Sequence, residues 1–453
     1  MKAPLAPARI AALHALRAVA GQRADLPSAL ALSRERLSDD RDRALAAEIV
    51  TGALRWQRSL DYLIEHFAGR RLSKIDGDIL LILRLSLYQL LHLDRVPASA
   101  VVDDAVNLAR YARKTSAAAF VNALLRTVLR QRHRLPLPPR PASAADRDAA
   151  LAYLGITHSH PAWLVARWLD RYGLEAAERW VQFNNATPRL TLRVNTLAAR
   201  RDAVAAALAA AGIETEPTTY APDGLIVTAG NPLRTSAGGS YLVQDEASQL
   251  VTLAVAARPE ERVLDLCASP GGKTVAMAAD MRDTGVLVAC DVRSRRVALL
   301  RETTRASGAA RIHLVHVGAS GHLPLAPVFD RVLLDAPCSG LGTIRRDPDI
   351  RWRRHEHDLG VFARDQLALL QRAAEVVSPG GRLVYATCSS EPEENEDVID
   401  AFLSARDDYA VIDLRTAGAS PPAPLIDSRG MLRTLPFAHG LEAFFAAALV
   451  RRG

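Results

Sequence analysis

Two cysteines stand in polar surroundings that mark them as candidate reactive thiols. Cys338 lies in Asp335-Ala336-Pro337-Cys338-Ser339-Gly340, and Cys388 lies in Thr387-Cys388-Ser389. A buried free cysteine usually acts only as a small hydrophobe, and this is how we interpret the thiols of Cys267 and Cys290. Cys338 and Cys388 instead follow apolar segments and adjoin polar residues, where a thiolate can act as a nucleophile.

Both cysteines come directly after a predicted β-strand. Residues 330–334 lead into the Cys338 motif, and residues 382–386 lead into Cys388. Open α/β sheets place their sites at the carboxyl ends of parallel strands. The sequence therefore predicts that two thiols and the Asp335 carboxylate meet in one pocket, although 388 − 338 = 50 residues separate the cysteines.

A glycine-rich turn upstream predicts a cradle for a nucleotide-like cofactor. The predicted strand 262–267 runs into Cys267-Ala268-Ser269-Pro270-Gly271-Gly272-Lys273, where the glycines let a ligand approach the backbone and the next helix presents free N–H groups. Neither GxGxxG nor GxxxxGK[ST] is present, which disfavours dinucleotide and nucleoside-triphosphate chemistry. Asp291 ends the next predicted strand, where a carboxylate can accept both hydroxyls of a ribose.

Composition narrows the class of protein. A chain of 453 residues, 49% of them hydrophobic, supports several cores, and we expect three domains. Four cysteines without a CxxC pair indicate neither a disulfide scaffold nor a zinc site, so we expect a cytoplasmic protein without a bound metal. No stretch approaches the ~20 apolar residues of a membrane span, so we expect no membrane role.

The charge favours a polyanionic partner. Lysine and arginine exceed the acidic residues by 57 − 50 = 7, although a basic soluble protein without such a partner is the alternative. Two basic groups stand out. Arg126 and Arg130 lie near the end of a predicted helix, and Arg345, Arg346 and Arg351 accompany Trp352 in a predicted loop after the Cys338 motif. We predict RNA contacts for both groups, through phosphates and base stacking, with solvated charge as the alternative.

The chain divides into four predicted parts. Residues 1–134 show helical periodicity, residues 135–149 form a proline-rich linker, residues 150–237 form a small α+β module, and residues 238–453 alternate strands with helices. The last part predicts a doubly wound parallel sheet of Rossmann-like type. Its seven candidate strands are residues 262–267, 286–291, 312–317, 330–334, 382–386, 409–414 and 444–450.

The ordered motifs resemble a known enzyme family. DLCASPGGKT, Asp291, DAPCSGLGTIRRDPDIRW, YATCS and ENE together resemble the RNA cytosine-C5 methyltransferases over residues 238–453. Residues 5–134, with patterns such as Ala119-Phe120-Val121-Asn122-Ala123-Leu124-Leu125-Arg126, resemble the helical RNA-binding domain of NusB-like proteins. The whole chain resembles the RsmB/Sun-type bacterial enzymes that modify 16S ribosomal RNA.

The resemblance implies a mechanism and a set of roles. S-adenosylmethionine would lie along Cys267 to Lys273, Asp291 and Asp335. Cys388 would add to carbon 6 of cytosine so that carbon 5 becomes nucleophilic. Cys338 would resolve the methylated adduct, either by removing the proton at carbon 5 or by assisting release of the thiol. Asp335 would also bind the polar edge of cytosine. The expected partner is 16S ribosomal RNA, and the expected state is a monomer.

Some points stay open at the level of sequence. The family usually has an aspartate after the third strand where this chain has Ala319, so the contact to the adenine of the cofactor must be supplied differently. We assign Glu393 to Glu396 to capping of a helix and give them no chemistry. A non-catalytic RNA-binding platform and the same chemistry on transfer RNA are the alternatives, and the modified nucleotide is not specified.

Overall fold

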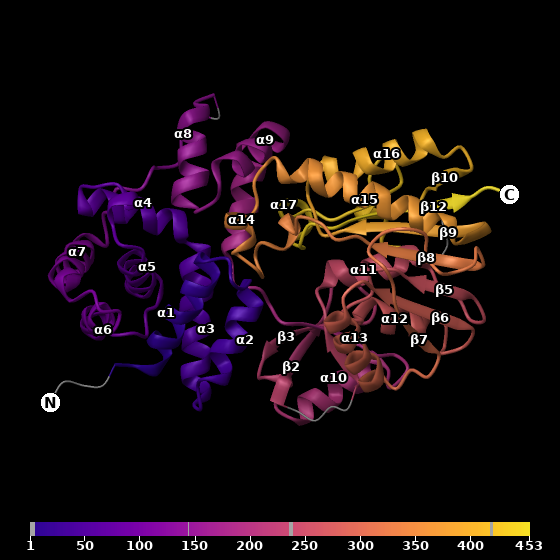
Figure 1. Cartoon of the computed structure of the whole chain (residues 1–453), viewed down its shortest axis with the longest axis horizontal. Coiled ribbons are helices and arrows are strands. Elements are labelled where there is room, and N and C mark those ends of the chain that lie inside the picture. The colour runs from indigo at the N-terminus through magenta and orange to yellow at the C-terminus, as the bar shows by residue number, and fades with distance from the viewer. Residues whose placement is uncertain (1–4, 144, 235–238, 417–419) are drawn as a thin grey trace. The chain divides into compact units, whose positions relative to one another are not determined.

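The computed structural model describes residues 5–143, 145–234, 239–416 and 420–453 (Figure 1). Its contacts form two compact units. The first unit comprises Met1–Ala186 and Ile344–His355, and the second unit comprises Thr187–Thr343 and Glu356–Gly453. The predicted boundary between residues 237 and 238 lies outside the described residues. Within those residues, no helix combines the length and the apolar character needed to cross a membrane.

The first unit is helical, as predicted for residues 1–134, but it extends to Ala186 and so includes residues that were predicted to belong to the small α+β module. Asp39 caps the third helix by accepting a hydrogen bond from the Arg41 N–H, and Asp76 caps the fifth in the same way from the Asp78 N–H. The helices of its first 131 residues are α1 (Pro7–Ala20), α2 (Leu26–Glu35), α3 (Asp40–Arg55), α4 (Gln57–Ala68), α5 (Gly77–His92), α6 (Ala98–Tyr111) and α7 (Ala118–Gln131).

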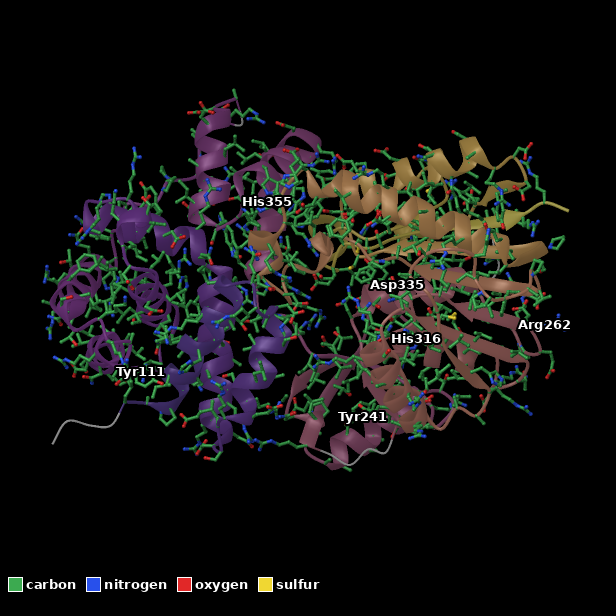
Figure 2. All side chains as sticks on the ribbon, viewed as in Figure 1. Tyr111, Tyr241, Arg262, His316, Asp335 and His355 are labelled. Atoms are coloured by element: carbon green, nitrogen blue, oxygen red, sulfur yellow. The ribbon has the colours of Figure 1, made fainter. Side chains whose placement is uncertain are left out.

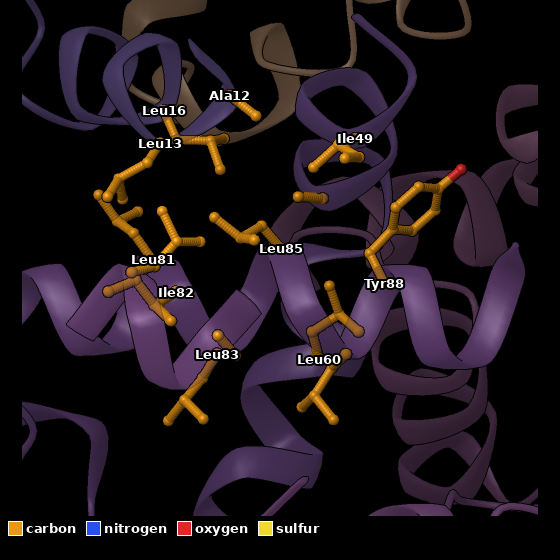
Figure 3. Close-up of a cluster of buried hydrophobic side chains, with 14 of the residues drawn as sticks. Ala12, Leu13, Leu16, Ile49, Leu60, Leu81, Ile82, Leu83, Leu85 and Tyr88 are labelled. Atoms are coloured by element: carbon orange, nitrogen blue, oxygen red, sulfur yellow. The ribbon is translucent and has the colours of Figure 1, made fainter. Parts of the chain in front are cut away.

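Helix α5 forms the centre of this helical core. Most of its residues are buried, which is typical of a helix surrounded by others. Gly52 of α3 allows close packing, since a Cβ there would lie 1.9 Å from Cζ of Tyr88. Figure 3 shows side chains of α5 meeting those of α1, α3 and α4, including Leu13, Leu16, Ile49, Leu60, Leu81, Ile82, Leu83 and Leu85.

A second helical layer of this unit is built on stacked tryptophans. Helix α8 (Arg147–Ala152) is followed by a π-helical turn (Tyr153–Thr157) and by α9 (Ala162–Asn185). Gly173 has a positive φ of 78° and divides α9 into two halves. The break lets Trp168 and Trp180, both fully buried, stack with ring centroids 4.5 Å apart.

The arginine-rich segment after the Cys338 motif belongs to the first unit, and this corrects the prediction for Arg351. Residues Ile344–His355 contain the short helix α14 (Ile350–Arg353) and pack among the helices of that unit. The Arg351 guanidinium is fully buried and donates to the Ser159 carbonyl at 2.9 Å and to Asn185 Oδ1 at 3.1 Å. A side chain buried in this way is not available to an RNA phosphate, so the predicted contact is wrong for Arg351.

The neighbours of Arg351 are held in the same segment. The Trp352 indole N–H donates to the Leu54 carbonyl at 2.6 Å, and the Arg345 guanidinium lies 4.0 Å from the centre of the Phe183 ring. Arg345, Arg346 and Trp352 are partly exposed, so RNA contacts through them stay a prediction.

Substitution of Arg351 by Met should lower the free energy of unfolding of the first unit by about 3 kcal/mol, because buried carbonyl oxygens lose their donors. Burial lowers the pKa of Arg351, and the charge of Arg55 adds to this effect. Urea titration followed by circular dichroism measures the change. The exposed Arg95→Met is the control and should alter the midpoint little. An equally small change for Arg351→Met would contradict the structural role.

The second unit begins with a small antiparallel sheet in the order β2-β3-β1-β4. Residues 189–195 alternate polar and apolar side chains and residues 224–227 are mostly apolar, which predicts strands, and these segments contain β1 (Thr191–Val194) and β3 (Gly224–Ala229). Helix α10 (Arg201–Ala210) packs on this sheet through Val204 and Leu208. The strands β2 (Glu214–Pro217) and β4 (Tyr241–Val243) were not predicted, because they are short and mostly exposed and show no alternation of apolar residues.

The predicted Rossmann-like sheet is confirmed, with strand order β10-β12-β9-β8-β5-β6-β7 and the short β11 paired to β12. Strands β9, β8, β5, β6 and β7 are parallel to one another, and β12 is antiparallel to β9 and β10. The strands are β5 (Arg262–Asp265), β6 (Val286–Asp291), β7 (Ile312–His316), β8 (Phe329–Asp335), β9 (Val377–Thr387), β10 (Tyr409–Ile412), β11 (Leu432–Arg433) and β12 (Phe445–Arg451).

Helices cover both faces of this sheet because alternate residues of each strand point to opposite faces. Leu264, Leu334 and Tyr385 pack with α15 (Asp358–Glu375) and α16 (Glu396–Ala405). Val263, Leu333 and Val384 pack with α11 (Glu246–Val255) and α12 (Gly272–Asp280), and α13 (Ser294–Ser307) lies on this second face through Leu300. Helix α17 (Pro436–His439) precedes β12 (Figure 1).

The chain order of the strands reverses between β5 and β8. Strands β6 and β7 extend from β5 on one side, and β8 and β9 extend on the other. Ligands of open α/β sheets bind at the carboxyl ends of the strands next to such a reversal. The predicted site residues come from the ends of β5, β6, β8 and β9, so they surround this point.

Candidate active site

The two candidate thiols meet at the carboxyl ends of neighbouring strands. Cys388 follows the last residue of β9, Cys338 lies three residues beyond β8, and their sulfur atoms are 3.2 Å apart. Both are free and partly exposed. The predicted convergence of Cys338 and Cys388 is confirmed. Figure 2 labels Asp335 at this edge, at the opposite end of the strands from Arg262.

Backbone hydrogen bonds extend the pairing of the strands into the two cysteine loops. The Ala336 N–H donates to the Ala386 carbonyl at 2.8 Å, and the Gly342 N–H donates to the Cys388 carbonyl at 2.9 Å. A Cβ at position 342 would lie 1.9 Å from the Ala443 carbonyl oxygen, so this contact requires glycine. The two thiols are therefore held by main-chain contacts between adjacent loops.

A buried carboxylate, Glu394, ties the two cysteine loops together. Its Oε2 accepts hydrogen bonds from the hydroxyls of Ser339 and Ser389, both at 2.5 Å, and its Oε1 accepts from the Ser339 N–H at 2.7 Å. Gln366 of α15 donates to the same Oε1 at 3.0 Å and to the Pro337 carbonyl at 3.0 Å. Since each serine directly follows one of the cysteines, Glu394 fixes both thiols from behind.

Glu394 and Asn395 were predicted to cap a helix, and their contacts with the cysteine loops were not predicted. Asn395 Oδ1 accepts from the Thr387 hydroxyl at 2.5 Å, and its amide nitrogen donates to the Ser389 carbonyl at 3.1 Å. Both side chains are fully buried. The signal was present as two serines, each following a cysteine and each needing a partner if buried.

Lys273 and Asp335 form an ion pair beside the thiols. Lys273 Nζ lies 2.8 Å from Asp335 Oδ2 and 2.9 Å from Ser248 Oγ. Burial alone lowers the pKa of Lys273, but the charge and hydrogen bond of Asp335, followed by the charge of Cys388, outweigh burial and raise this pKa. The ammonium predicted to bind cofactor is thus directed toward Asp335, beside the thiol of Cys388.

The hydrogen bond to Cys388 raises the pKa of the Cys338 thiol, and burial raises it further. A raised pKa keeps Cys338 protonated at neutral pH. In that state its S–H can donate to the Cys388 sulfur. The pair therefore combines a protonated donor with a potential nucleophile.

The predicted glycine cradle lies between β5 and α12. Gly271 has a φ of 111°, and a Cβ there would lie 2.9 Å from Leu300 Cδ1, so the turn requires glycine at this position. Ala268, Ser269 and Gly271 are buried, Cys267 and Gly272 are partly exposed, and Pro270 is exposed. Burial raises the pKa of the Cys267 thiol, in keeping with its interpretation as a small hydrophobe.

Asp291 provides a test of whether this cradle fits a nucleoside. Its Oδ1 accepts from the Arg293 N–H at 3.1 Å, whereas its Oδ2 is buried and has no hydrogen-bond donor within the described part of the chain. Arg296 Nη1 lies 3.8 Å from this Oδ2. A buried acceptor without a donor is unfavourable, and a ribose hydroxyl would satisfy it. The residues present therefore fit a nucleoside cofactor.

Asp265 should make stability depend on pH. Burial raises its pKa to about 7, against the hydrogen bond that it accepts from Thr274 Oγ1 at 2.7 Å. Because an unfolded aspartate titrates near 4, the free energy of unfolding should fall as pH rises from about 4 to about 7, by roughly 4 kcal/mol in all.

Substitution Asp265→Asn should remove this part of the pH dependence, since the amide does not titrate. Urea midpoints at pH 5 and pH 8 measure the effect, with the exposed Asp397→Asn as a control that keeps the normal dependence. Equal pH dependence in Asp265→Asn and the unsubstituted protein would contradict the raised pKa.

The predicted RNA-binding residues of the first unit lie apart in sequence from these motifs. Arg126 and Arg130 are exposed on α7, where they donate to Asn122 Oδ1 and Thr127 Oγ1 of the same helix. Both guanidinium groups remain accessible, and their contact with RNA stays a prediction.

Family models match three consecutive parts of the chain. Residues 6–130 match the NusB family, and residues 160–234 match the ferredoxin-like domain of RsmF/B-like methyltransferases. Residues 252–450 match the model described as 16S rRNA methyltransferase RsmB/F. The last match contains the cradle, both thiols and Glu394.

Similar proteins match over nearly the whole chain. A probable ribosomal RNA small subunit methyltransferase B of Bacillus subtilis is 35% identical, covering 91% of this chain and 92% of the relative. Ribosomal RNA small subunit methyltransferase B of Pseudomonas syringae pv. tomato is 33% identical, with 98% and 96% covered. The crystal structure of PH0851 matches with a TM-score of 0.79 and 26% identity over 99% of both chains. The chain therefore belongs to the 16S rRNA methyltransferase RsmB/F family.

Proposed function

We propose that this protein methylates carbon 5 of a cytosine in 16S ribosomal RNA, using S-adenosylmethionine and a transient bond between Cys388 and the base. The observation that carries the proposal is the pair of thiols 3.2 Å apart beside the Lys273–Asp335 ion pair. Relatives named as small-subunit methyltransferases support the choice of RNA. The related structure of NSun6 from Pyrococcus horikoshii with SFG has a similar fold, with a TM-score of 0.57 and 20% identity.

The Cys388 thiolate would begin the reaction by adding to carbon 6 of cytosine. The electrons of the bond between carbons 5 and 6 then make carbon 5 nucleophilic, which an unmodified cytosine is not. The Lys273 ammonium holds Asp335, which binds the polar edge of the base. When bound, S-adenosylmethionine supplies an electrophilic methyl group.

Resolution of the adduct requires loss of the proton from carbon 5 and cleavage of the bond between carbon 6 and sulfur. The double bond re-forms, and the departing electron pair returns to the Cys388 sulfur. We assign Cys338 to this step as a hydrogen-bond donor that stabilises the departing thiolate, because its sulfur lies 3.2 Å from that of Cys388. The proton from carbon 5 passes to solvent or to another base.

The cofactor would be held by the cradle and by Asp291. The backbone of Ser269 to Gly272 faces the ligand at the start of α12, and the unsatisfied Oδ2 of Asp291 accepts from the ribose. The helical first unit would contribute to the choice of RNA through exposed cations such as Arg126 and Arg130.

Incubation of the protein with 16S ribosomal RNA and methyl-labelled S-adenosylmethionine tests the proposal. Nuclease digestion and mass spectrometry should find the label in 5-methylcytidine at one position, and transfer RNA should accept little. A label in another nucleoside, or preferential labelling of transfer RNA, would contradict the proposed reaction or substrate. No label with the unsubstituted protein, although it binds the cofactor, would favour a non-catalytic platform.

A further inference from the structure

A pocket of the second unit lies next to Asp291. It begins at Cys267 and Val292, which follow β5 and β6, and continues to the loop after β7. Val292 is 38% exposed although it is apolar. With a ribose on Asp291, the base of a nucleoside would extend into this pocket.

One face of α15 forms a wall of the pocket. The lining residues recur every three or four positions, which is the spacing of a single helix face. Their apolar members suit the flat faces of a purine, and their polar members can reach its edge. They are Phe362, Asp365, Ala368, Leu369, Gln371, Arg372 and Glu375.

Two charged residues of this face are engaged in holding the loop after β7. Arg372 donates to the carbonyl oxygens of Gly318 and Ala319, both at 3.1 Å. Glu375 pairs with His322, with 2.9 Å between Oε2 and Nδ1. The loop therefore presents only a methyl group at Ala319, because the Ala319 carbonyl oxygen already accepts a hydrogen bond from Arg372.

Asp365 is the remaining carboxylate of the α15 face. It is exposed, and in the described part of the chain no donor lies within hydrogen-bond distance of it. An adenine carries an exocyclic amino group that needs an acceptor, whereas the loop side chain at position 319 cannot supply one. A carboxylate is the strongest acceptor available for such an N–H group.

We propose that Asp365 on α15 binds the exocyclic amino group of the cofactor's adenine and so determines its preference for adenine over hypoxanthine. This inference rests on the proposed use of S-adenosylmethionine. The helix supplies the contact that the loop after β7 lacks, and Arg372 keeps that loop in place as the opposite wall.

Calorimetric binding of two probes tests the inference without relying on methyl transfer. S-adenosylhomocysteine carries the amino group, and S-inosylhomocysteine carries a carbonyl oxygen in its place. The unsubstituted protein should bind the first at least tenfold more tightly, because a carbonyl oxygen facing a carboxylate leaves both acceptors unpaired. The variants Asp365→Ala and Asp365→Asn are measured with both probes, and Asp397→Asn on α16 is the control.

Asp365→Ala should weaken S-adenosylhomocysteine binding about tenfold and reduce the preference. Asp365→Asn should reduce the preference further, since its amide N–H can donate to the oxygen of hypoxanthine. The control should keep the original ratio. An unchanged ratio in both Asp365 variants would overturn the role of Asp365 while leaving the proposed function intact. If the unsubstituted protein binds neither probe, the proposed cofactor fails and the role of Asp365 with it.

Discussion

Substitution of Cys388 by Ala should abolish methyl transfer, whereas substitution of Cys338 by Ala should leave an RNA-bound enzyme. Without the Cys388 sulfur, carbon 5 is never activated, and the rate should fall on the order of 10⁴-fold or more, as for other nucleophile deletions. Without Cys338, the adduct can form but is released slowly. The two sulfur atoms are only 3.2 Å apart, so their positions alone do not show which one attacks the base. Opposite outcomes of the two substitutions would distinguish their roles.

Gel electrophoresis under denaturing conditions measures the RNA-bound fraction, and labelled methyl transfer measures turnover. Cys290→Ala is a suitable control, since this buried thiol belongs to the core of the sheet. It should retain turnover and accumulate no complex. Accumulation of the complex in Cys388→Ala, with release unaffected in Cys338→Ala, would reverse the assignment of the two cysteines.

Substitution of Glu394 by Ala should produce the second-largest loss. Its two oxygens accept four hydrogen bonds, three of them from the serines that follow the cysteines. Loss of these bonds should let both thiols move, and a displacement of about 1 Å can cost 10²-fold in rate. We therefore expect turnover to fall about 10²-fold or more.

Glu394→Gln separates charge from position. The glutamine keeps one acceptor oxygen and the approximate shape, so we expect partial activity, between that of Glu394→Ala and that of the unsubstituted protein. Binding of S-adenosylhomocysteine should change little in either variant, because Glu394 lies behind the thiols and not in the cradle. Asp397→Asn controls for an altered acidic charge nearby. Unchanged turnover in Glu394→Ala would contradict the positioning role.

The parallel part of the sheet was predictable because its central strands β5, β6, β8 and β9 are largely buried on both faces and read as apolar runs. The positions of the cysteine and glycine motifs were predictable as well, since each motif follows the carboxyl end of a strand, where open α/β sheets place their sites. That reasoning was enough to bring Cys338 and Cys388 together from 50 residues apart.

Contacts that depend on tertiary packing were not predictable from local pattern. Glu394 looks like any acidic residue near a helix start, and its partners lie 5 and 55 residues away in the chain. Arg351 looks like a solvated cation in a charged loop, although its donors bind carbonyl oxygens from the ends of distant helices. A buried guanidinium satisfied by main-chain oxygens has no signature in sequence spacing.

Mass spectrometry of the trapped protein shows directly whether Cys388 bonds to the cytosine base. Ribosomal RNA containing 5-fluorocytosine retains a fluorine at carbon 5, which cannot leave as a proton does, so the adduct should persist. After digestion with nuclease and protease, we expect a methylated fluoropyrimidine nucleotide attached to the peptide that contains Cys388. Attachment to Cys338, or a peptide of unmodified mass under conditions that give methyl transfer to ordinary RNA, would contradict it.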